Sequence, residues 1–281
     1  QVARRREAQL AALVESTAER HLPEALTYGP TDKQQDRWLQ RATGVLGEQL
    51  GEVRDRIFTM LNPQRHHLLL DLNASTGLLT WEAVRHAPEG GVYSCAHTPQ
   101  TYSALVEQAT MLDELARPTV VTVKDADWVK APEDSTTEKS LLFDGIVGRN
   151  ALMALEEKED AIAQLSQLLH SNGSIVLAES IPSRSQRLSN LLTFSKAKAN
   201  LQEQLETAEY MIFNTHADAM VNWDAPELQK AFEVTDFNCE IDVVTFSTTA
   251  VITPAQLEGW RGKGGKYCSQ LQEQGTSPKD M

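Results

Sequence analysis

The sequence predicts an α/β fold: a doubly wound, mostly parallel sheet with an antiparallel C-terminal strand pair and an N-terminal helical extension. Two observations lead to this prediction. Between residues 68 and 179, short apolar runs alternate with helical patterns, as a parallel sheet requires. The first run ends at Asp71 and passes through the small-residue turn Asn73–Gly77 into a helical pattern. Strand, tight turn and helix open sheets of this kind, whose ligands lie at the carboxyl ends of the strands.

The composition is that of a soluble globular protein with a strongly acidic charge balance. Of the 281 residues, 41% are hydrophobic and 23% are charged, which suffices for one large domain with an extension. The net charge of −13, from 26 Lys and Arg against 39 Asp and Glu, argues against a broad surface for nucleic acid or for an anionic membrane. Direct nucleic-acid binding is therefore not favoured, although a local basic patch stays open.

The cysteines form no metal-ligand pattern and fit a reducing compartment. They are Cys95, Cys239 and Cys268. No apolar run reaches transmembrane length and no signal peptide opens the chain, so we expect a cytoplasmic protein. His66-His67 lacks partners at metal-ligand spacing, so no metal site is predicted. Because the first residue is Gln1 rather than methionine, we expect the chain to be a piece of a longer polypeptide.

Residues 1–63 are predicted to form a helical extension that covers one face or edge of the sheet. Residues 1–21 show a mixed-charge helical pattern beside the basic triplet Arg4–Arg6, which either contacts phosphate or is a solvated helix start. After the Gly29-Pro30 turn, apolar residues recur at helical spacing from residue 31 to residue 61. This spacing predicts a second, longer helix in the extension.

Five strands and three helices are expected in the sheet domain. The strands are the apolar or β-branched runs 68–72, 92–96, 119–123, 143–148 and 174–179. The helices are the amphipathic segments 76–86, 99–115 and 156–170. Pro99 stands in the first turn of the second helix, and Asn172-Gly173 is a stop signal for the third. A polar loop is expected at residues 124–138.

The pattern changes after residue 183. Residues 183–210 are interpreted as a polar helix within a helical insertion, 183–221, and residues 222–232 as a further helix. Residues 232–238 and 242–252 are predicted to form the antiparallel strand pair. The predicted domains are therefore a helical extension to residue 63, an α/β domain from residue 64 to residue 255, and a flexible tail from residue 256 to residue 281.

The segments at the strand ends resemble those of class I S-adenosylmethionine-dependent methyltransferases, which have a Rossmann-like fold. Asp71–Gly77 is similar to the family's acidic residue and Gly-rich turn around the methionine end of the cofactor. Val92–His97 resembles the strand whose acidic end holds the ribose, and Lys124–Trp128 the loop beside the adenine. Phe143–Asn150 resembles the segment that faces the transferred methyl group, and Leu168–Glu179 the turn into the fifth strand.

This resemblance covers about residues 66–252 and implies S-adenosylmethionine as the cofactor. The residues that it places at the cofactor are Asp71, Asn73, Ala74, Ser75, Gly77, Ala96, His97, Asp125, Ala126 and Arg149. Asp71 either contacts the ligand through water or orders its own turn. Asp127 is a register-shifted alternative to Asp125 beside the adenine, and a solvated loop aspartate is the other interpretation. Catalytic residues stay open, because methyl transfer needs mainly positioning and a deprotonated acceptor.

Three residues depart from the family's pattern. Asn73 replaces the first glycine of the turn, although asparagine tolerates positive φ better than most residues. Ser75 replaces the second glycine, where it either crowds the ligand or caps the following helix. Ala96 replaces the acid that holds the ribose; losing a bond to a charged group, worth roughly 1.5–3 kcal/mol, weakens binding by about 10- to 100-fold. The adjacent His97 is either a substitute ribose partner or a surface histidine.

Four further side chains are candidates for contacts with a ligand. Arg149 and Asn150 lie at the carboxyl end of a strand, where they contact substrate or where Asn150 caps a helix. Trp81 and Trp128 either form the wall of an adenine site or belong to the core.

The Asp-Leu-Asn opening, the helical cover and the Gln1 start are also similar to the C-terminal methyltransferase-like region fused to an AAA+ ATPase recombination factor in cyanobacteria. This second resemblance implies an N-terminal ATPase region of the same polypeptide as the partner, and work in DNA recombination or replication repair. The chain itself carries no phosphate-binding lysine motif.

Two functions follow from these resemblances. The first is an S-adenosylmethionine-dependent methyltransferase-like domain, whose unknown N, O or S acceptor lies between Arg149-Asn150 and the helical insertion. The alternative is a catalytically silent methyltransferase-fold interaction module attached to the ATPase. A nicotinamide-dependent oxidoreductase is disfavoured, because the GxGxxG motif and the ribose acid are both absent and the antiparallel strand pair fits methyltransferases better.

Overall fold

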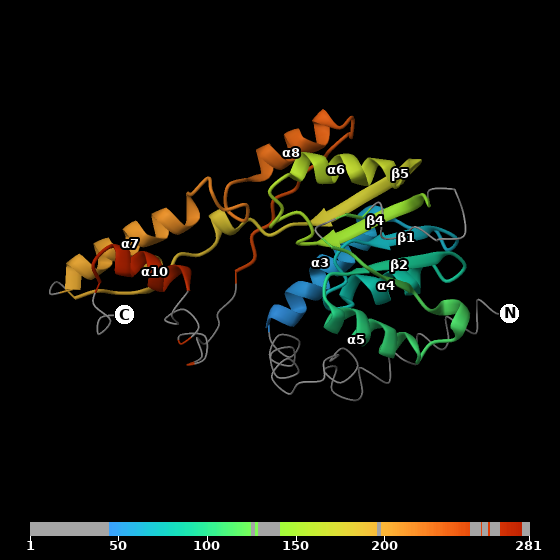
Figure 1. The fold of residues 1–281 in the computed structure, drawn as a ribbon, viewed down its shortest axis with the longest axis horizontal. Helices are drawn as coiled ribbons and strands as arrows, with labels where there is room; N and C mark the ends of the chain where they lie inside the picture. The colour runs from blue at the N-terminus through green and yellow to red at the C-terminus, as the bar shows by residue number, and fades with distance from the viewer. Residues whose placement is uncertain are drawn as a thin grey trace. The chain divides into compact units, whose positions relative to one another are not determined.

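A computed structural model describes residues 45–124, 127, 128, 141–195, 198–247, 254, 258 and 265–276 of the chain (Figure 1). The chain divides into two compact units. The sheet unit consists of Gln1–Leu152 and Glu157–Glu179, and the helical unit consists of Met153–Glu156 and Ser180–Met281. The domain boundaries after residues 63 and 255 stay predictions.

The sheet unit is built on parallel strands in the order β3-β2-β1-β4-β5. The strands are β1 (Leu68–Asp71), β2 (Gly91–Ala96), β3 (Thr119–Thr122), β4 (Phe143–Arg149) and β5 (Leu169–Ala178). From β1 the chain first adds β2 and β3 on one side and then crosses back to add β4 and β5 on the other. This order confirms the predicted doubly wound parallel sheet.

The central strand, β1, is buried on both of its faces. It pairs with β2 and with β4, and Leu69 and Leu70 are fully buried. A continuous apolar run is what a central parallel strand requires, because helices cover both faces of such a sheet. The strand predicted at residues 68–72 is therefore confirmed as β1, which lies at the centre of the sheet.

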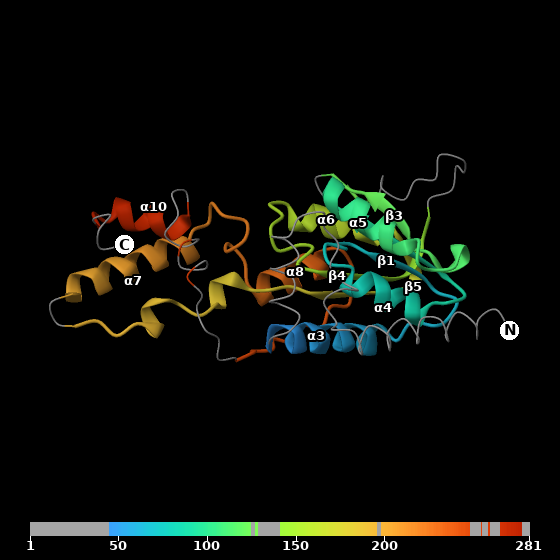
Figure 2. The ribbon, with the colours of Figure 1, turned by 90° about the horizontal axis from the view of Figure 1, so that it is seen from below.

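Helices cover both faces of the sheet (Figure 2). The helices of the sheet unit are α3 (Val45–Leu61), α4 (Leu78–His86), α5 (Pro99–Ala109) and α6 (Lys158–Gln167). α3 and α4 pack in one hydrophobic cluster, which joins Ile57 and Phe58 of α3 to Ala83 of α4 and to Leu69 of β1. α6 lies on the opposite face of the sheet from α3 (Figure 2). α3 thus forms part of the predicted helical cover, whereas residues 1–44 lie outside the described residues.

α4 begins at Leu78, two residues later than predicted. The residue before it, Gly77, has a left-handed backbone with φ 70° and makes no side-chain cap bond. The predicted alternative that Ser75 caps this helix is therefore wrong. Glycine is required at position 77, because the positive φ disfavours other residues and a Cβ there would collide with the Trp81 indole.

α5 has a side-chain cap at its start and ends earlier than predicted. The Thr98 hydroxyl oxygen accepts a hydrogen bond from the Thr101 backbone N–H at 3.1 Å. The helix ends at Ala109, and the residues that follow form turns and the 3-10 helix η1 (Glu114–Ala116).

Replacing Thr98 with alanine is expected to lower the free energy of unfolding by about 1 kcal/mol, because one of the N–H groups at the start of α5 loses its acceptor. Thr98→Ser keeps the hydroxyl and should stay within about 0.5 kcal/mol of the parent protein. Urea unfolding measures both. Equal losses in the two variants would show that the hydroxyl is not what stabilises the helix start.

β5 begins at Leu169, earlier than predicted, because the preceding helix already ends at Gln167. Asn172-Gly173 lies inside the strand, so the prediction of a helix stop there is wrong. Residues 170–173 of β5 lie opposite only Asp144 of β4, which makes this part of the strand irregular. The Asn-Gly pair marks a bulge in a strand and not the end of a helix.

The helical unit consists of helices joined by turns. Its described elements are η2 (Pro182–Arg184), η3 (Ser189–Leu191), α7 (Ala199–Phe213), α8 (Ala225–Val234) and α10 (Lys266–Glu273). The prediction of a helix over residues 183–210 is wrong for its first half, because α7 begins only at Ala199. The buried carboxylate of Glu209 accepts hydrogen bonds from the N–H groups of Leu188 and Ser189, at 2.6 and 3.4 Å, which folds that stretch against α7.

The described residues do not form the antiparallel strand pair predicted at 232–238 and 242–252. Phe232 is buried as part of the apolar face of α8, so the helix continues to Val234. Residues 237–247 are irregular, and residues 248–252 lie outside the described part of the chain. The exposed side chains of residues 237–247 include Val243 (45%), Val244 (43%) and Phe246 (41%). The segment has the composition of a strand, but within the described residues it has no strand partner.

Part of the tail predicted to be flexible forms a helix. α10 packs against α7, where the Tyr267 hydroxyl donates to Glu209 Oε1 at 3.0 Å and the Gln204 amide donates to the Gln274 carbonyl oxygen at 3.0 Å. Of the helices that the structure describes, none combines the length and the apolar composition that crossing a membrane requires.

Candidate functional site

The direction of strand addition reverses between β1 and β4. In open α/β sheets, ligands bind in the crevice outside the carboxyl ends of the two strands at such a reversal. β1 ends in the turn that leads to α4, and β4 ends at Arg149. The pairing of Asp71 with Val147 places these two strand ends next to each other. We therefore take this edge of the sheet as the candidate site.

Asp71 lies beneath the turn and is fully buried. Its carboxylate accepts hydrogen bonds from the Thr80 hydroxyl at 2.8 Å and from the Asn73 N–H at 3.1 Å. Burial raises the pKa of this carboxyl from its ordinary value of 3.8 to about 6, although the bonds to Thr80 and Asn73 oppose the shift. Of its two sequence interpretations, the structure favours the one in which Asp71 orders its own turn. No pattern in the sequence indicated that Thr80 would be its partner.

Asn73 connects the turn after β1 to the end of β4. Its side-chain amide donates to the carbonyl oxygens of Arg149, at 2.9 Å, and of Asn150, at 3.3 Å. Asn150 has a left-handed backbone with φ 53°, and its N–H donates to the Ala178 carbonyl oxygen at 2.9 Å. Asn73 thus ties together the two strand ends of the candidate site.

The outer part of the turn offers backbone donors. Ala74 is buried, and its N–H donates to the Cys95 carbonyl oxygen at 3.0 Å. Ser75 is exposed, and the backbone N–H groups of Ser75 and Thr76 donate to no group in the described part of the chain. Both precede the start of α4, whose partial positive charge favours an anion. The N–H groups of Ser75 and Thr76 are therefore the donors that this turn can offer to an anionic group.

The end of β2 presents one buried and one exposed residue. Ala96 is fully buried in an apolar cluster with Ala74 and Leu105. His97 is exposed, and its Nε2 lies 2.8 Å from the Leu72 carbonyl oxygen. An aspartate at position 96 would bury its charge among apolar side chains, so His97 is the residue at this strand end that can face a ligand.

The predicted adenine partners lie partly outside the described residues. Asp125 and Ala126 are not among them, whereas the Asp127 N–H donates to the Lys124 carbonyl oxygen at 3.0 Å. Trp128 is 1% exposed, and its indole N–H donates to the Leu72 carbonyl oxygen at 3.4 Å. The structure therefore favours the interpretation of Trp128 as a core residue over its interpretation as the wall of an adenine site.

Glu179, directly after β5, is a further polar residue at this edge that the sequence analysis did not single out. Its carboxylate accepts hydrogen bonds from the N–H groups of Ala151, at 2.8 Å, and Leu152, at 3.1 Å. Glu179 thereby fixes the turn that follows Asn150. Burial lowers the pKa of Lys158, and the charge of Glu179 opposes this shift. An acid at the end of a predicted strand was the available sequence signal.

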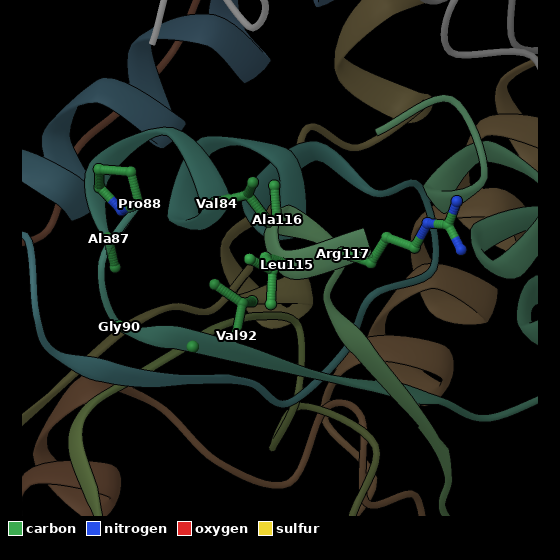
Figure 3. Close-up of a pocket in the computed structure, with 9 residues that line it drawn as sticks. Val84, Ala87, Pro88, Gly90, Val92, Leu115, Ala116 and Arg117 are labelled. Atoms are coloured by element: carbon green, nitrogen blue, oxygen red, sulfur yellow. The ribbon is translucent and has the colours of Figure 1, made fainter. Parts of the chain in front are cut away.

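A separate pocket lies at the opposite edge of the sheet, where β2 begins (Figure 3). Its lining residues are Val84, Ala87, Pro88, Gly90, Gly91, Val92, Leu115, Ala116 and Arg117. Figure 3 shows the Arg117 side chain directed away from Val92 and Leu115, and its Nε donates to the Leu112 carbonyl oxygen at 3.1 Å. The other lining residues carry no polar side chain. This pocket is not part of the candidate site, which lies at the carboxyl ends of the strands.

No group of three or more His, Cys, Asp and Glu side chains with the arrangement of a metal site occurs within the described residues. Burial raises the pKa of the Cys95 thiol well above its usual value, with the charge of Asp71 as a second cause. The Cys95 thiol is therefore protonated at neutral pH and is not a nucleophile.

No protein-family model matches the chain, and no curated protein does either. Solved structures do match. The CcbJ methyltransferase from Streptomyces caelestis is 17% identical over 48% of this chain and 53% of its own, with a TM-score of 0.38. The precorrin-6y C5,15-methyltransferase from Geobacter metallireducens GS-15 is 19% identical over 45% of this chain and 60% of its own, with a TM-score of 0.35.

A candidate O-methyltransferase from Nostoc punctiforme is 13% identical over 71% of this chain and 54% of its own, with a TM-score of 0.46. The chain thus spans between 53% and 60% of the length of these three proteins. The fold of the sheet unit rests on its own strand order, and these weak similarities add no evidence about its activity.

Proposed function

We propose that the sheet unit is a methyltransferase-like domain that binds S-adenosylmethionine at the carboxyl edge between β1 and β4. The observation that carries this proposal is the position of the turn Asn73–Gly77, which lies where the direction of strand addition reverses. The resemblance of this turn to the family's motif supports this cofactor over other nucleotides. The acceptor, an N, O or S atom, stays open.

The hydrogen-bonding groups at this edge fit the methionine end of the cofactor. The N–H groups of Ser75 and Thr76 would hold its carboxylate. The carbonyl oxygens of Arg149 and Asn150, to which the Asn73 amide donates, would be the acceptors for its ammonium group. When bound, the cofactor supplies a methyl group on a positively charged sulfur. The role of the protein is to position that methyl group against the acceptor.

The ribose end of the cofactor would be held less strongly than in the family. The buried Ala96 offers no side-chain acceptor, and the bonds of a carboxylate to ribose are therefore missing. We expect a dissociation constant about 10- to 100-fold above that of a site with the acid.

Calorimetric titration of the chain with S-adenosylmethionine and S-adenosylhomocysteine tests the proposal. A dissociation constant below about 100 µM, which corresponds to roughly −5.5 kcal/mol, would support a cofactor site. Absence of heat with both ligands at millimolar concentration would contradict it.

A catalytically silent module is the second candidate. It is favoured by hydrogen bonds within the protein that engage polar groups at the candidate site. Asp71 is engaged by Thr80, and the Asn73 amide is engaged by the carbonyls at the end of β4. In this case the chain would serve as an interaction domain for an N-terminal AAA+ ATPase region of the same polypeptide, in DNA recombination or replication repair. The only support for that partner is the sequence resemblance.

Two measurements separate the candidates. The silent module predicts no cofactor binding and a stable complex with the ATPase region expressed as a separate chain, measured by analytical ultracentrifugation. Direct binding of this chain to DNA is not expected, because its net charge is −13. Cofactor binding without a complex would reject the silent module.

Replacing Asn73 with glycine is expected to tighten the binding of S-adenosylhomocysteine by about 3- to 10-fold, because the two carbonyl oxygens lose a competing donor worth roughly 0.5–1.5 kcal/mol per bond. The same change should lower the free energy of unfolding by about 1–2 kcal/mol. Calorimetry and urea unfolding measure the two effects.

Asn73→Ala is the matched control, because it removes the amide and keeps the Cβ. Equal tightening in both variants would identify the amide as the competing group. Unchanged affinity in both would show that the bonds of Asn73 do not oppose the ligand.

A further inference from the structure

The imidazole of His97 is fixed in one tautomer by its bond to the main chain. Its Nε2 lies 2.8 Å from the carbonyl oxygen of Leu72. A carbonyl oxygen only accepts hydrogen bonds, so Nε2 carries the proton. In the neutral ring the other nitrogen, Nδ1, is then unprotonated and accepts hydrogen bonds.

Trp128 engages the same carbonyl oxygen. Its buried indole N–H donates to Leu72 at 3.4 Å, so both lone pairs of that oxygen have donors. The His97 ring is thus tied to the main chain at the carboxyl end of β2, while the residue remains exposed. An acceptor that is already held in place loses less side-chain entropy when a ligand binds.

His97 stands at the position where a doubly wound fold contacts ribose. It directly follows β2 and lies about 20 residues beyond Gly77, the spacing at which such folds place the side chain that bonds the ribose hydroxyls. The preceding residue, Ala96, is turned into the apolar cluster with Ala74 and Leu105. At this strand end, His97 therefore offers the side-chain acceptor that Ala96 lacks.

We propose that His97 Nδ1 accepts a hydrogen bond from one ribose hydroxyl of the bound nucleoside, in place of the missing carboxylate. This inference rests on the proposed function, because it concerns the same site. A carboxylate offers two oxygens, whereas Nδ1 offers one lone pair. The site therefore recognises one ribose hydroxyl, the 2′ or the 3′, and tolerates removal of the other.

The test compares S-adenosylhomocysteine with its 2′-deoxy and 3′-deoxy analogues by calorimetry, on the parent chain and on His97→Gln. Glutamine is the matched variant, because its amide nitrogen can replace Nε2 as the donor to Leu72, whereas its carbonyl oxygen does not occupy the position of Nδ1. On the parent chain, we expect one of the two analogues to bind about 2- to 10-fold more weakly than S-adenosylhomocysteine. On His97→Gln, we expect S-adenosylhomocysteine to weaken by a similar factor and the two analogues to bind equally.

Three results of these titrations would overturn the proposal. If the two analogues bind the parent chain as tightly as S-adenosylhomocysteine, or if His97→Gln still discriminates between them, His97 is not the ribose acceptor, and the proposed cofactor site stands. If none of the three ligands binds the parent chain at millimolar concentration, the proposed function fails together with this inference.

Nitrogen NMR of the histidine rings in the parent chain gives a readout that needs neither ligand nor variant. We expect the neutral His97 ring to be protonated on Nε2. A neutral ring protonated on Nδ1 would overturn the proposal even if S-adenosylhomocysteine binds, and this measurement remains decisive if the glutamine variant does not fold.

Discussion

Replacing Gly77 with alanine is expected to lower the free energy of unfolding by about 2–5 kcal/mol. A residue with a side chain costs roughly 1–2 kcal/mol in the left-handed backbone conformation that Gly77 adopts at φ 70°. The added Cβ would also lie inside van der Waals contact of the Trp81 indole. Trp81 packs on the cluster of Ala74, Ala96 and Leu105, so displacing it adds roughly 1–3 kcal/mol.

Gly51→Ala is the matched control for this substitution. Gly51 lies within α3, and a Cβ there would meet no atom within 4 Å. Alanine is expected to stabilise the protein by about 0.5–1 kcal/mol at this position, because it is the better helix former. Urea unfolding measures both variants. A loss below about 1 kcal/mol for Gly77→Ala would show that the turn readily adopts another backbone conformation.

The stability of the sheet unit is expected to carry a contribution from Asp71 that grows as the pH falls. The folded protein raises the pKa of this buried carboxyl from 3.8 to about 6, so it binds the proton more tightly than the unfolded chain does. The contribution is therefore fully present below about pH 4 and is lost as the pH rises to about 6. Its size is about 3 kcal/mol, since each pKa unit corresponds to roughly 1.4 kcal/mol.

Asp71→Asn isolates this contribution from those of the other acidic groups. Asparagine has no charge to lose, so the free energy of unfolding of the parent, relative to the variant, should fall by about 3 kcal/mol between pH 4 and pH 7. Urea unfolding across this range provides the comparison. A difference that stays constant with pH would show that the Asp71 carboxyl titrates at its ordinary pKa in the folded protein.

The sequence predicted the first strand because burial on both faces demands an unbroken apolar run, as at Leu68–Leu70. It predicted the ends of elements less well. Asn172-Gly173 has the chemistry of a helix stop, and only the pairing with β4 shows that the pair lies in a bulge. The β-branched segment near Val243 predicted a strand, but composition does not tell whether a sheet edge is within reach.

The location of the candidate site could be predicted from the sequence, but the contacts of its residues could not. The turn after β1 was recognised from its spacing within strand, turn and helix. The bonds from Asn73 to Arg149 and Asn150 join parts of the chain that are far apart in the sequence, so no local pattern reveals them. The burial of Ala96 and the tautomer of His97 depend on the packing of neighbouring strands in the same way.

The irregular segment at residues 241–247 also bears on how the protein behaves at high concentration. From Val243 to Ser247 the chain is rich in β-branched and aromatic residues and carries no charge and no proline. Such a window, exposed to solvent, is a template for strand pairing between molecules and thus for aggregation. The acidic residues Glu240 and Asp242 stand beside it, where like-charge repulsion between approaching copies opposes that pairing. The solubility of the protein therefore depends on ionic strength, because added salt screens this repulsion.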